Sequence, residues 1–562
     1  MLMTACASDD EPNGGNSDAT AAKYLAVNIQ NVGAALTRAG ESYEDGNSKE
    51  NQINKVRFYF FHADGSPYIL KNTSDETTSG KDANWLETNA IQNTGDKVEH
   101  PNLEKITNTV LLINGTTASA PATVIAVINP ETLTSTTLGS DAINLNTLRQ
   151  TLTDTKFYNG TGTDATDFVM SNSVYLDAGT SVCSAIISGH VADTKEAAEA
   201  SPVEIYVERV VAKVQASIDQ SKFEKGDNKN WSSQKYGIKV GTYGNNTDVY
   251  AAIDGWGIAD EDGKAELEKQ IDNNWTSATI GIDPWTTADY HRSFWSKSVP
   301  FSSGAGGNQP VNHKFNDYTT TFGMPVYTLP NTPTSVSDFA DPYNNYLTKF
   351  LVATHLRYKD SEGNWKNAEI CSYRGVEYLG VENLKTEIAN YYKKYYTKTA
   401  ESTYETIKPE DIKFSTTQTN ASAGDLKDYQ VVATLADASK TYYVNKGTES
   451  APNWQAVSAT DVNNSLAEVP AEVRTDGMAY YYIPIRHLAD DNTKLGYYGI
   501  VRNHAYKINL TDIKGFGTPV YDPNKIIDPT VPSDKNTFLA ARINVLSWRV
   551  VSQNADLNKT QK

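Results

Sequence analysis

The chain has 562 residues and a formal net charge of −18 at pH 7. This length predicts two or three domains, and the acidic composition, which has no basic stripe, argues against nucleic-acid binding because phosphate contacts need clustered Lys and Arg. No run approaches 18 consecutive apolar residues, so the sequence predicts no transmembrane helix. Aromatic residues make up 10% of the chain and 33 of them are Tyr, which favours half-buried β-sheet surfaces.

The N-terminus reads MLMTAC. Small residues directly before Cys6 resemble the end of a bacterial lipoprotein signal, although the charged start and apolar core of a full signal are missing. The acidic, polar segment 7–18 follows and resembles the tether of surface lipoproteins in Bacteroidetes-type bacteria. The alternative is an ordinary polar tail.

The first predicted strand covers 23–30, where Leu25, Val27 and Ile29 alternate with smaller or polar residues. A soft loop follows it, and this loop carries a lone arginine, Arg38, immediately before Ala39. Small, polar residues around an arginine are typical of an exposed segment that proteases can cut. Arg57 lies inside another predicted strand and is therefore a poorer target.

Short runs rich in Val, Ile, Tyr and Phe, separated by turn residues, predict further strands. The strands expected are 55–63, 123–130, 167–176, 204–218 and 429–436. Helical spacing predicts short helices at 141–152, 263–275 and 381–396. Residues 219–345 have little periodicity and predict long loops, and a domain boundary is expected near 205–215.

The chain closes with a proline-rich linker, 515–536, and a strong strand signal over 537–557. In that last run two apolar alternations are out of phase, and they meet at Val545 and Leu546. Because a one-residue slip turns every side chain to the other face, the change of phase predicts a bulge or break there, which would give two strands.

The sequence offers no catalytic constellation. The eight His residues form no H-E-x-x-H motif, and the acidic run at 260–262 fails the calcium-loop spacing. Acidic pairs such as Glu410 and Asp411 are typical of a solvated surface. Three isolated cysteines make no disulfide framework, although a Cys183–Cys371 bridge remains open. No enzyme activity, metal or cofactor is predicted.

One ordered set of motifs is specific. Residues 478–510 contain YYYIPIRH followed by GIVRNHAYKI, and they resemble the C-terminal signature of the Bacteroidales fimbrillins, or type V pilins. The segments TVIAVINP, FVMSNS and VERVVAKV resemble the N-terminal domain of that family. The chain end, INVLSWRVVSQNADL, is similar to the minor, short-fimbria branch. Residues 219–470 carry no such match.

This resemblance implies a mechanism. Fimbrillin subunits travel as lipoproteins to the outer membrane surface, where an arginine-specific protease removes the lipid together with the first strand. By this resemblance Cys6 is the lipidation site and Arg38–Ala39 is the scissile bond. A C-terminal donor strand from the next subunit then fills the groove, which builds a head-to-tail fimbrium. The candidate donor residues are Ile543, Val545, Leu546, Trp548 and Val550.

The predicted fold is all-β, with two β-sandwich domains of transthyretin-like, Greek-key type and short helical decorations. The expected division is a leader with a removable strand (1–38), an N-terminal domain (39–210), a C-terminal domain with long loops (211–514), the linker (515–536) and donor strands (537–562). The predicted function is a structural pilin subunit that supports adhesion.

The first alternative is a surface glycan-binding lipoprotein whose nine Trp and many Tyr residues form sugar platforms. The second is a glycosidase. Within the resemblance, Arg38 favours a stalk subunit over an anchor subunit, and the long middle segment leaves a tip subunit open.

Overall fold

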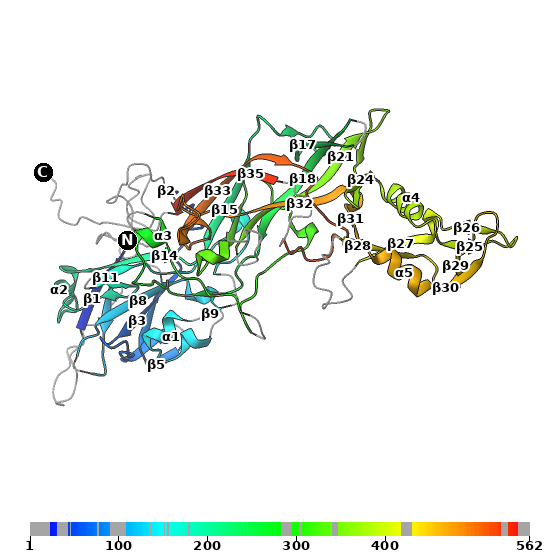
Figure 1. The fold of residues 1–562 in the computed structure, drawn as a ribbon. Helices are drawn as coiled ribbons and strands as arrows, with labels where there is room; N and C mark the ends of the chain where they lie inside the picture. Colours follow the sequence, from blue (N-terminus) through cyan, green and yellow to red (C-terminus); the bar gives the residue numbers. More distant parts are fainter. Residues whose placement is uncertain are drawn as a thin grey trace.

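The computed structural model describes residues 23–30, 43–44, 46–75, 78–89, 108–117, 119–133, 136–150, 152–153, 157–177, 180–243, 246–282, 295–302, 306–339, 347–416, 430–529 and 538–548. The molecule is elongated, with an N-terminal β domain at one end, a β-sandwich in the middle and a separate lobe at the other end (Figure 1). In this part of the chain no helix is long and apolar enough to cross a membrane.

The N-terminal domain is built on an eight-stranded sheet. Its order is β6 (Trp85–Asn89), β3 (Lys55–Phe61), β8 (Thr123–Ile128), β10 (Met170–Asn172), β14 (Val203–Arg209), β1 (Lys23–Gln30) and β7 (Asn108–Ile113), with β13 (Ala185–Ile186) beside β8. The sequences KVRFYFF and TVIAVI are nearly continuous apolar runs, and such runs form strands that are buried on both faces. Phe58, Phe60 and Ile125 are accordingly fully buried in this core.

Small elements decorate this domain. They are β4 (Leu70–Asp75), β5 (Thr78–Ala83), α1 (Leu145–Arg149), β9 (Leu152–Thr153), β11 (Tyr175–Asp177), β12 (Thr180–Val182) and α2 (Lys195–Glu199). The two helices begin at Asn144 and Thr194, whose side chains accept hydrogen bonds from backbone N–H groups of the first turn. The predicted helix at 141–152 is therefore confirmed as a shorter element.

The C-terminal domain is a sandwich of two sheets. One sheet has the order β2 (Tyr43–Glu44), β35 (Phe538–Trp548), β33 (His504–Lys514), β15 (Ala212–Ile218) and β20 (Pro325–Thr328). The other has the order β16 (Glu224–Lys225), β17 (Tyr236–Tyr243), β18 (Thr247–Ala259), β21 (Lys349–Lys359), β32 (Met478–Pro484) and β34 (Thr518–Pro519), with β22 (Trp365–Asn367) beside β21. Val214 and Tyr506 of the first sheet and Ile253 and Val352 of the second share one core. The predicted all-β class is confirmed.

The single strand-like run at 204–218 joins the two domains. Its first half is β14 of the N-terminal sheet and its second half is β15 of the sandwich, and the buried pair Val210-Val211 lies between them. The chain thus passes from one sheet to the other within two residues, which holds the two domains close together.

A third lobe is inserted between β22 and β32. It contains β23 (Ile370–Tyr373), β24 (Val376–Leu379), α4 (Val381–Tyr391), β25 (Tyr396–Lys398), β26 (Tyr404–Thr406), β27 (Ile412–Thr416), β28 (Gln430–Leu435), β29 (Tyr442–Asn445), β30 (Trp454–Val457), α5 (Ala459–Ala467) and β31 (Ala471–Val473). It has its own core, which includes Leu384, Ile388 and Tyr442. Its two ends meet, because the Arg474 N–H donates to the Ile370 carbonyl at 3.0 Å. Figure 1 shows this lobe at the end of the molecule opposite the N-terminal domain.

Two predictions about the middle of the chain are wrong. Residues 263–275 form no helix but contain β19 (Ala265–Glu266), which pairs with β9 so that Leu267 packs into the N-terminal core. Residues 219–345 are not only loops, since they contain β17, the 13-residue strand β18 and the four-residue helix α3 (Ser277–Ile280). The Ala and Gly residues of β18 obscured its alternation. The predicted helix at 381–396 is confirmed as α4, which ends at Tyr391.

Candidate strand-exchange site

Strand β1 occupies an interior position in the N-terminal sheet. It runs parallel to β14, with Val27 opposite Val203 and Ile29 opposite Ile205. On its other side it runs antiparallel to β7, with Leu25 opposite Leu111. The first strand of the chain therefore bridges two strands that would otherwise be separated by its width.

The side chains of β1 are part of the domain core. Leu25 and Val27 are both 0% exposed, and Ala26 is 5% exposed. Burial of two such side chains stabilises the domain by roughly 3–6 kcal/mol, at about 1.5–3 kcal/mol each. The start of the strand is held by mutual backbone hydrogen bonds between Tyr24 and Ala192, at 2.8 and 2.9 Å, and by an ion pair between Lys23 and Asp193.

The chain that follows the candidate cleavage site is fixed at the domain junction. Glu50 is 0% exposed, and its carboxylate accepts hydrogen bonds from Lys213 at 3.0 Å and from the Asn47 N–H at 2.8 Å. The Tyr327 hydroxyl also donates to Glu50. Arg209, at the end of β14, donates to the Glu50 carbonyl at 3.1 Å. None of these contacts involves a residue of β1.

Sequence reasoning missed this anchor. The segment VERVVAKV placed Arg209 and Lys213 in an apolar strand signal, and charged side chains in such a strand need a buried partner. These two charged residues predict a buried acidic partner, although only the fold shows that this partner is Glu50.

The C-terminal strand β35 belongs to a sheet of the sandwich domain in the same chain. It pairs antiparallel with β33 from Lys514 opposite Phe538 to His504 opposite Ser547. This is the arrangement that a terminal strand folded back on its own domain would have. Ile543, Val545, Leu546 and Trp548 all lie in β35.

The predicted break near Val545 and Leu546 is wrong. These two residues face Tyr506 and Ala505 in uninterrupted register. The irregularity falls instead between Leu510 and Asp512 of β33, where the partner strand has one extra residue. This bulge lies opposite Ala540 and Ala541, so the pairing through Val545 and Leu546 is regular.

The chain after the candidate cleavage site meets the candidate donor strand in the folded chain. Strand β2, which follows the candidate cleavage site, runs parallel to the end of β35, with Tyr43 opposite Ser547 and Glu44 opposite Trp548. Cys6, Arg38, Ala39 and Val550 lie outside the described residues.

A second buried charged cluster lies at the same junction. Lys269 donates to Glu208 at 2.8 Å with both side chains fully buried, and Arg502 donates to the Leu267 carbonyl at 2.9 Å. Neither carboxylate oxygen of the neighbouring Glu268 accepts a hydrogen bond. Burial raises the pKa of Glu268 to about 8, while the positive charges of Arg502 and Arg149 oppose the rise.

The described cysteines are not bridged. Cys183 and Cys371 are free, buried thiols. Cys183 donates to the Lys269 carbonyl at 3.1 Å, whereas Cys371 belongs to the core of the third lobe. Burial raises the pKa of both thiols to about 12, which disfavours the reactive thiolate. Within the described residues no cluster of three or more His, Cys, Asp or Glu side chains could hold a metal ion.

The C-terminal region of the chain matches a known protein family. Residues 474–554 match the family described as major fimbrial subunit protein type IV, fimbrillin, C-terminal. This stretch contains β32, β33, β34 and β35, so it spans both sheets of the sandwich. No curated protein matches the sequence.

Several solved structures resemble the chain at low identity. A fimbrilin from Porphyromonas gingivalis is 11% identical, with 94% of this chain and 98% of that chain covered and a TM-score of 0.35. A C-terminally truncated tip fimbrial protein from the same organism is 11% identical, with coverages of 94% and 100% and a TM-score of 0.30. A fimbrial assembly protein from Parabacteroides distasonis is 10% identical, with coverages of 64% and 85% and a TM-score of 0.26.

The β-rich architecture and the matched C-terminal region define a class of structural fimbrial subunits, not of enzymes. The C-terminal region is similar to that of the fimbrillins, as the motifs at 478–510 predicted. This match supports a place in a fimbrium at the cell surface, together with other fimbrial components.

Proposed function

We propose that this subunit polymerises by strand exchange that proteolysis triggers. An arginine-specific protease cuts the Arg38–Ala39 bond, and the released piece carries β1 and the lipid on Cys6. A C-terminal strand of the next subunit then enters the vacated position. Lipid anchoring at the outer membrane precedes this step and ends with it.

The position of β1 is the observation that carries the proposal. It is the first strand that the structure describes, and it lies between β14 on one side and β7 on the other. Removal of an interior strand exposes two rows of backbone hydrogen-bonding groups and an apolar slot, and a new strand can satisfy both. The anchor at Glu50 keeps the remaining chain in place when the leader leaves.

The donor comes from the segment that contains Ile543, Val545, Leu546, Trp548 and Val550. In the single chain most of this segment pairs with β33. Exchange therefore replaces one set of strand contacts by another, and the driving force is the filling of the empty slot beside β14. The contact joins different surfaces of the two subunits, so its repetition gives an open filament and not a closed ring.

Cleavage is the first test. The purified chain is incubated with trypsin, and the new N-terminus and the oligomer size are measured. We expect cleavage after Arg38, retention of residues 46–51 in the folded body, and higher oligomers. Arg57 is the internal control, because its guanidinium donates to Glu87 at 2.7 Å inside β3 and should resist the protease. Arg38→Ala should stay monomeric, and oligomers formed by this variant would refute the proposal.

Cysteine cross-linking tests which residues enter the slot. Leu112 is 53% exposed and lies opposite Tyr24 of β1, so Leu112→Cys places a thiol beside the vacated strand without opening the core. It is combined with single cysteines at positions 543 to 550. Intermolecular disulfides that appear only after cleavage, and peak at one or two positions, identify the donor register. A uniform absence of cross-links in polymerised material would exclude this segment as the donor.

A further inference from the structure

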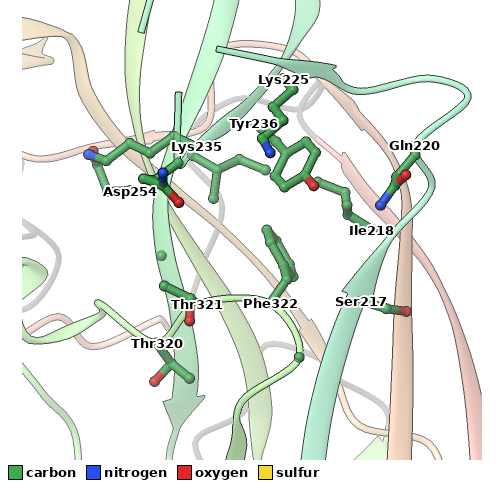
Figure 2. A pocket seen from close by; sticks show the side chains of 14 residues that line it. Ser217, Ile218, Gln220, Lys225, Lys235, Tyr236, Asp254, Thr320, Thr321 and Phe322 are labelled. Carbon is green, nitrogen blue, oxygen red and sulfur yellow. The ribbon is translucent and has the colours of Figure 1, made fainter. Parts of the chain in front are cut away.

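A half-open pocket of about 550 Å³ lies in the sandwich domain (Figure 2). Its walls come from the end of β15, from β16 and the start of β17, from β18, and from the loop that precedes β20. A volume of this order is typical of small-molecule sites. The proposed strand exchange uses none of these residues.

The wall formed by β18 depends on a bulge. The register with β21 shifts between Ile253 and Gly255, so Asp254 is an extra residue in the strand. Bulges redirect side chains. The Asp254 carboxylate accepts a hydrogen bond from Lys235 at 2.5 Å, and it also contacts the His355 ring. A Cβ at position 255 would lie 2.6 Å from the Tyr318 carbonyl, so Gly255 is required for the neighbouring loop to cross the strand.

The loop on the opposite wall is held rigidly. Thr320 forms two backbone hydrogen bonds with Trp256, at 3.0 and 3.2 Å, and the Trp256 indole donates to the Thr321 carbonyl at 3.1 Å. Gly323 donates to the Ala216 carbonyl of β15 at 2.7 Å. Both walls are therefore fixed before any ligand arrives, which lowers the entropic cost of binding.

The lining combines aromatic rings with unused polar groups. Tyr236 and Phe322 form an edge-to-face pair with centroids 6.3 Å apart, and Figure 2 shows them between Gln220 on one side and the Lys235–Asp254 pair on the other. Lys225 lies opposite Tyr236 in the β16–β17 ladder, on the same sheet face. Among the described residues, the side chains of Lys225, Gln220 and Tyr236 have no hydrogen-bond or ion-pair partner.

The charged side chains of the pocket indicate which kind of ligand it favours. Lys235 neutralises Asp254, while Glu224 lies on the opposite face of the sheet because successive side chains of a strand alternate. Lys225 therefore leaves one uncompensated positive charge in a chain whose net charge is −18. An anionic group is the complementary partner, and the aromatic pair beside it suits a ring with an apolar face.

We infer that this pocket binds the terminal acidic sugar of a glycan, with the sugar ring against Tyr236 and Phe322 and its carboxylate at Lys225. The side-chain amides of Gln220 and Gln234 and the carboxylate of Asp254 are suited to the sugar hydroxyls. The pocket is half open, so the rest of the glycan extends into solvent. The site gives the subunit an adhesive role that does not depend on polymerisation.

Titration calorimetry on the uncleaved, monomeric chain tests this inference. The probes are 3′-sialyllactose, which carries a carboxylate, and lactose as its neutral counterpart. We expect sialyllactose to bind about tenfold or more tightly than lactose, since one charge-assisted contact is of this order. Lys225→Met should lower the affinity for sialyllactose to that for lactose, and Phe322→Ala should weaken both.

Lys239→Met is the matched control. Lys239 is an exposed lysine of β17 outside the pocket, where it pairs with Asp248 at 2.6 Å, and its loss should leave the affinity unchanged. Absence of sialyllactose binding at millimolar concentration would overturn the inference, as would equal binding by Lys225→Met and the parent chain. Because the measurement uses the uncleaved chain, its result is separate from that of the cleavage experiment.

Discussion

The Glu50 carboxylate and the Lys213 ammonium are 3.0 Å apart and almost completely buried between the two β domains. This pair joins the chain after the candidate cleavage site to β15 of the sandwich. It belongs to the body of the subunit, whereas β1, only 20 residues before Glu50, is the part proposed to leave.

Lys213→Met should destabilise the subunit by about 3–5 kcal/mol, because it leaves the Glu50 carboxylate buried without its cation. The double variant with Glu50→Gln should recover part of that loss. Urea unfolding of the single and double variants measures both effects. A loss below about 1 kcal/mol in the single variant would show that water or another group compensates Glu50.

Leu25→Ala should destabilise the uncleaved subunit by about 2–5 kcal/mol, since Leu25 is completely buried in the N-terminal core. The same change should have no effect on the polymer, because the proposed cleavage removes β1. Thermal unfolding of both forms provides the comparison. Leu111→Ala, on the neighbouring strand that stays, is the control and should weaken both forms. An equal loss for Leu25→Ala in the polymer would mean that β1 remains in place.

Glu268→Gln should change how stability depends on pH. The pKa of Glu268 is raised by burial from 4.5 to about 8 in the folded chain. Between these values the unfolded state loses the proton while the folded state keeps it, so the folded state loses stability as pH rises. Glutamine removes this loss, and the variant should gain about 1–3 kcal/mol over the parent at pH 8 and almost nothing at pH 4.5.

Denaturant unfolding at several pH values tests this gain. The charged groups that face Glu268 are the positive Arg502 and Arg149 and the negative Glu208. The substitution changes none of these three residues. Asp262, whose pKa burial raises to about 7, retains a slope of the same sign in both proteins. A constant difference across the pH range would show that Glu268 does not titrate in this interval.

Arg474→Met should loosen the third lobe. The buried Arg474 guanidinium donates to the carbonyls of Phe516 and Gly517, both at 3.0 Å, and its loss leaves these groups without that donor. We expect a cost of about 1–3 kcal/mol for each unsatisfied group. Hydrogen exchange should rise at the base of the lobe, around Ile370, and not in the N-terminal sheet. Arg474→Lys restores the charge but not the fork of donors, so it should recover only part of the protection.

The sequence predicted the elements whose signal is local. Strand β1 was predicted correctly because the spacing of Leu25 and Val27 is a local pattern, although Ala26 on the other face is also buried. The motifs around 478–510 likewise predicted the match of residues 474–554 to the C-terminal fimbrillin family.

What could not be predicted depends on contacts far apart in the chain. The helical spacing at 263–275 was overridden because Leu267 packs into the N-terminal core and Lys269 pairs with Glu208, 61 residues away. Strand β35 continues past Val545 because it pairs along its length with β33, and no pattern within β35 itself could show this. The pocket combines residues of five separate segments, which sequence spacing does not bring together.

The third lobe leaves and re-enters the sandwich at one point, where Arg474 and Ile370 share a backbone hydrogen bond. An insertion whose ends touch can change in length or content without stretching the strands that hold it. Recombination at this junction would therefore replace the third lobe and leave both sheets of the sandwich intact.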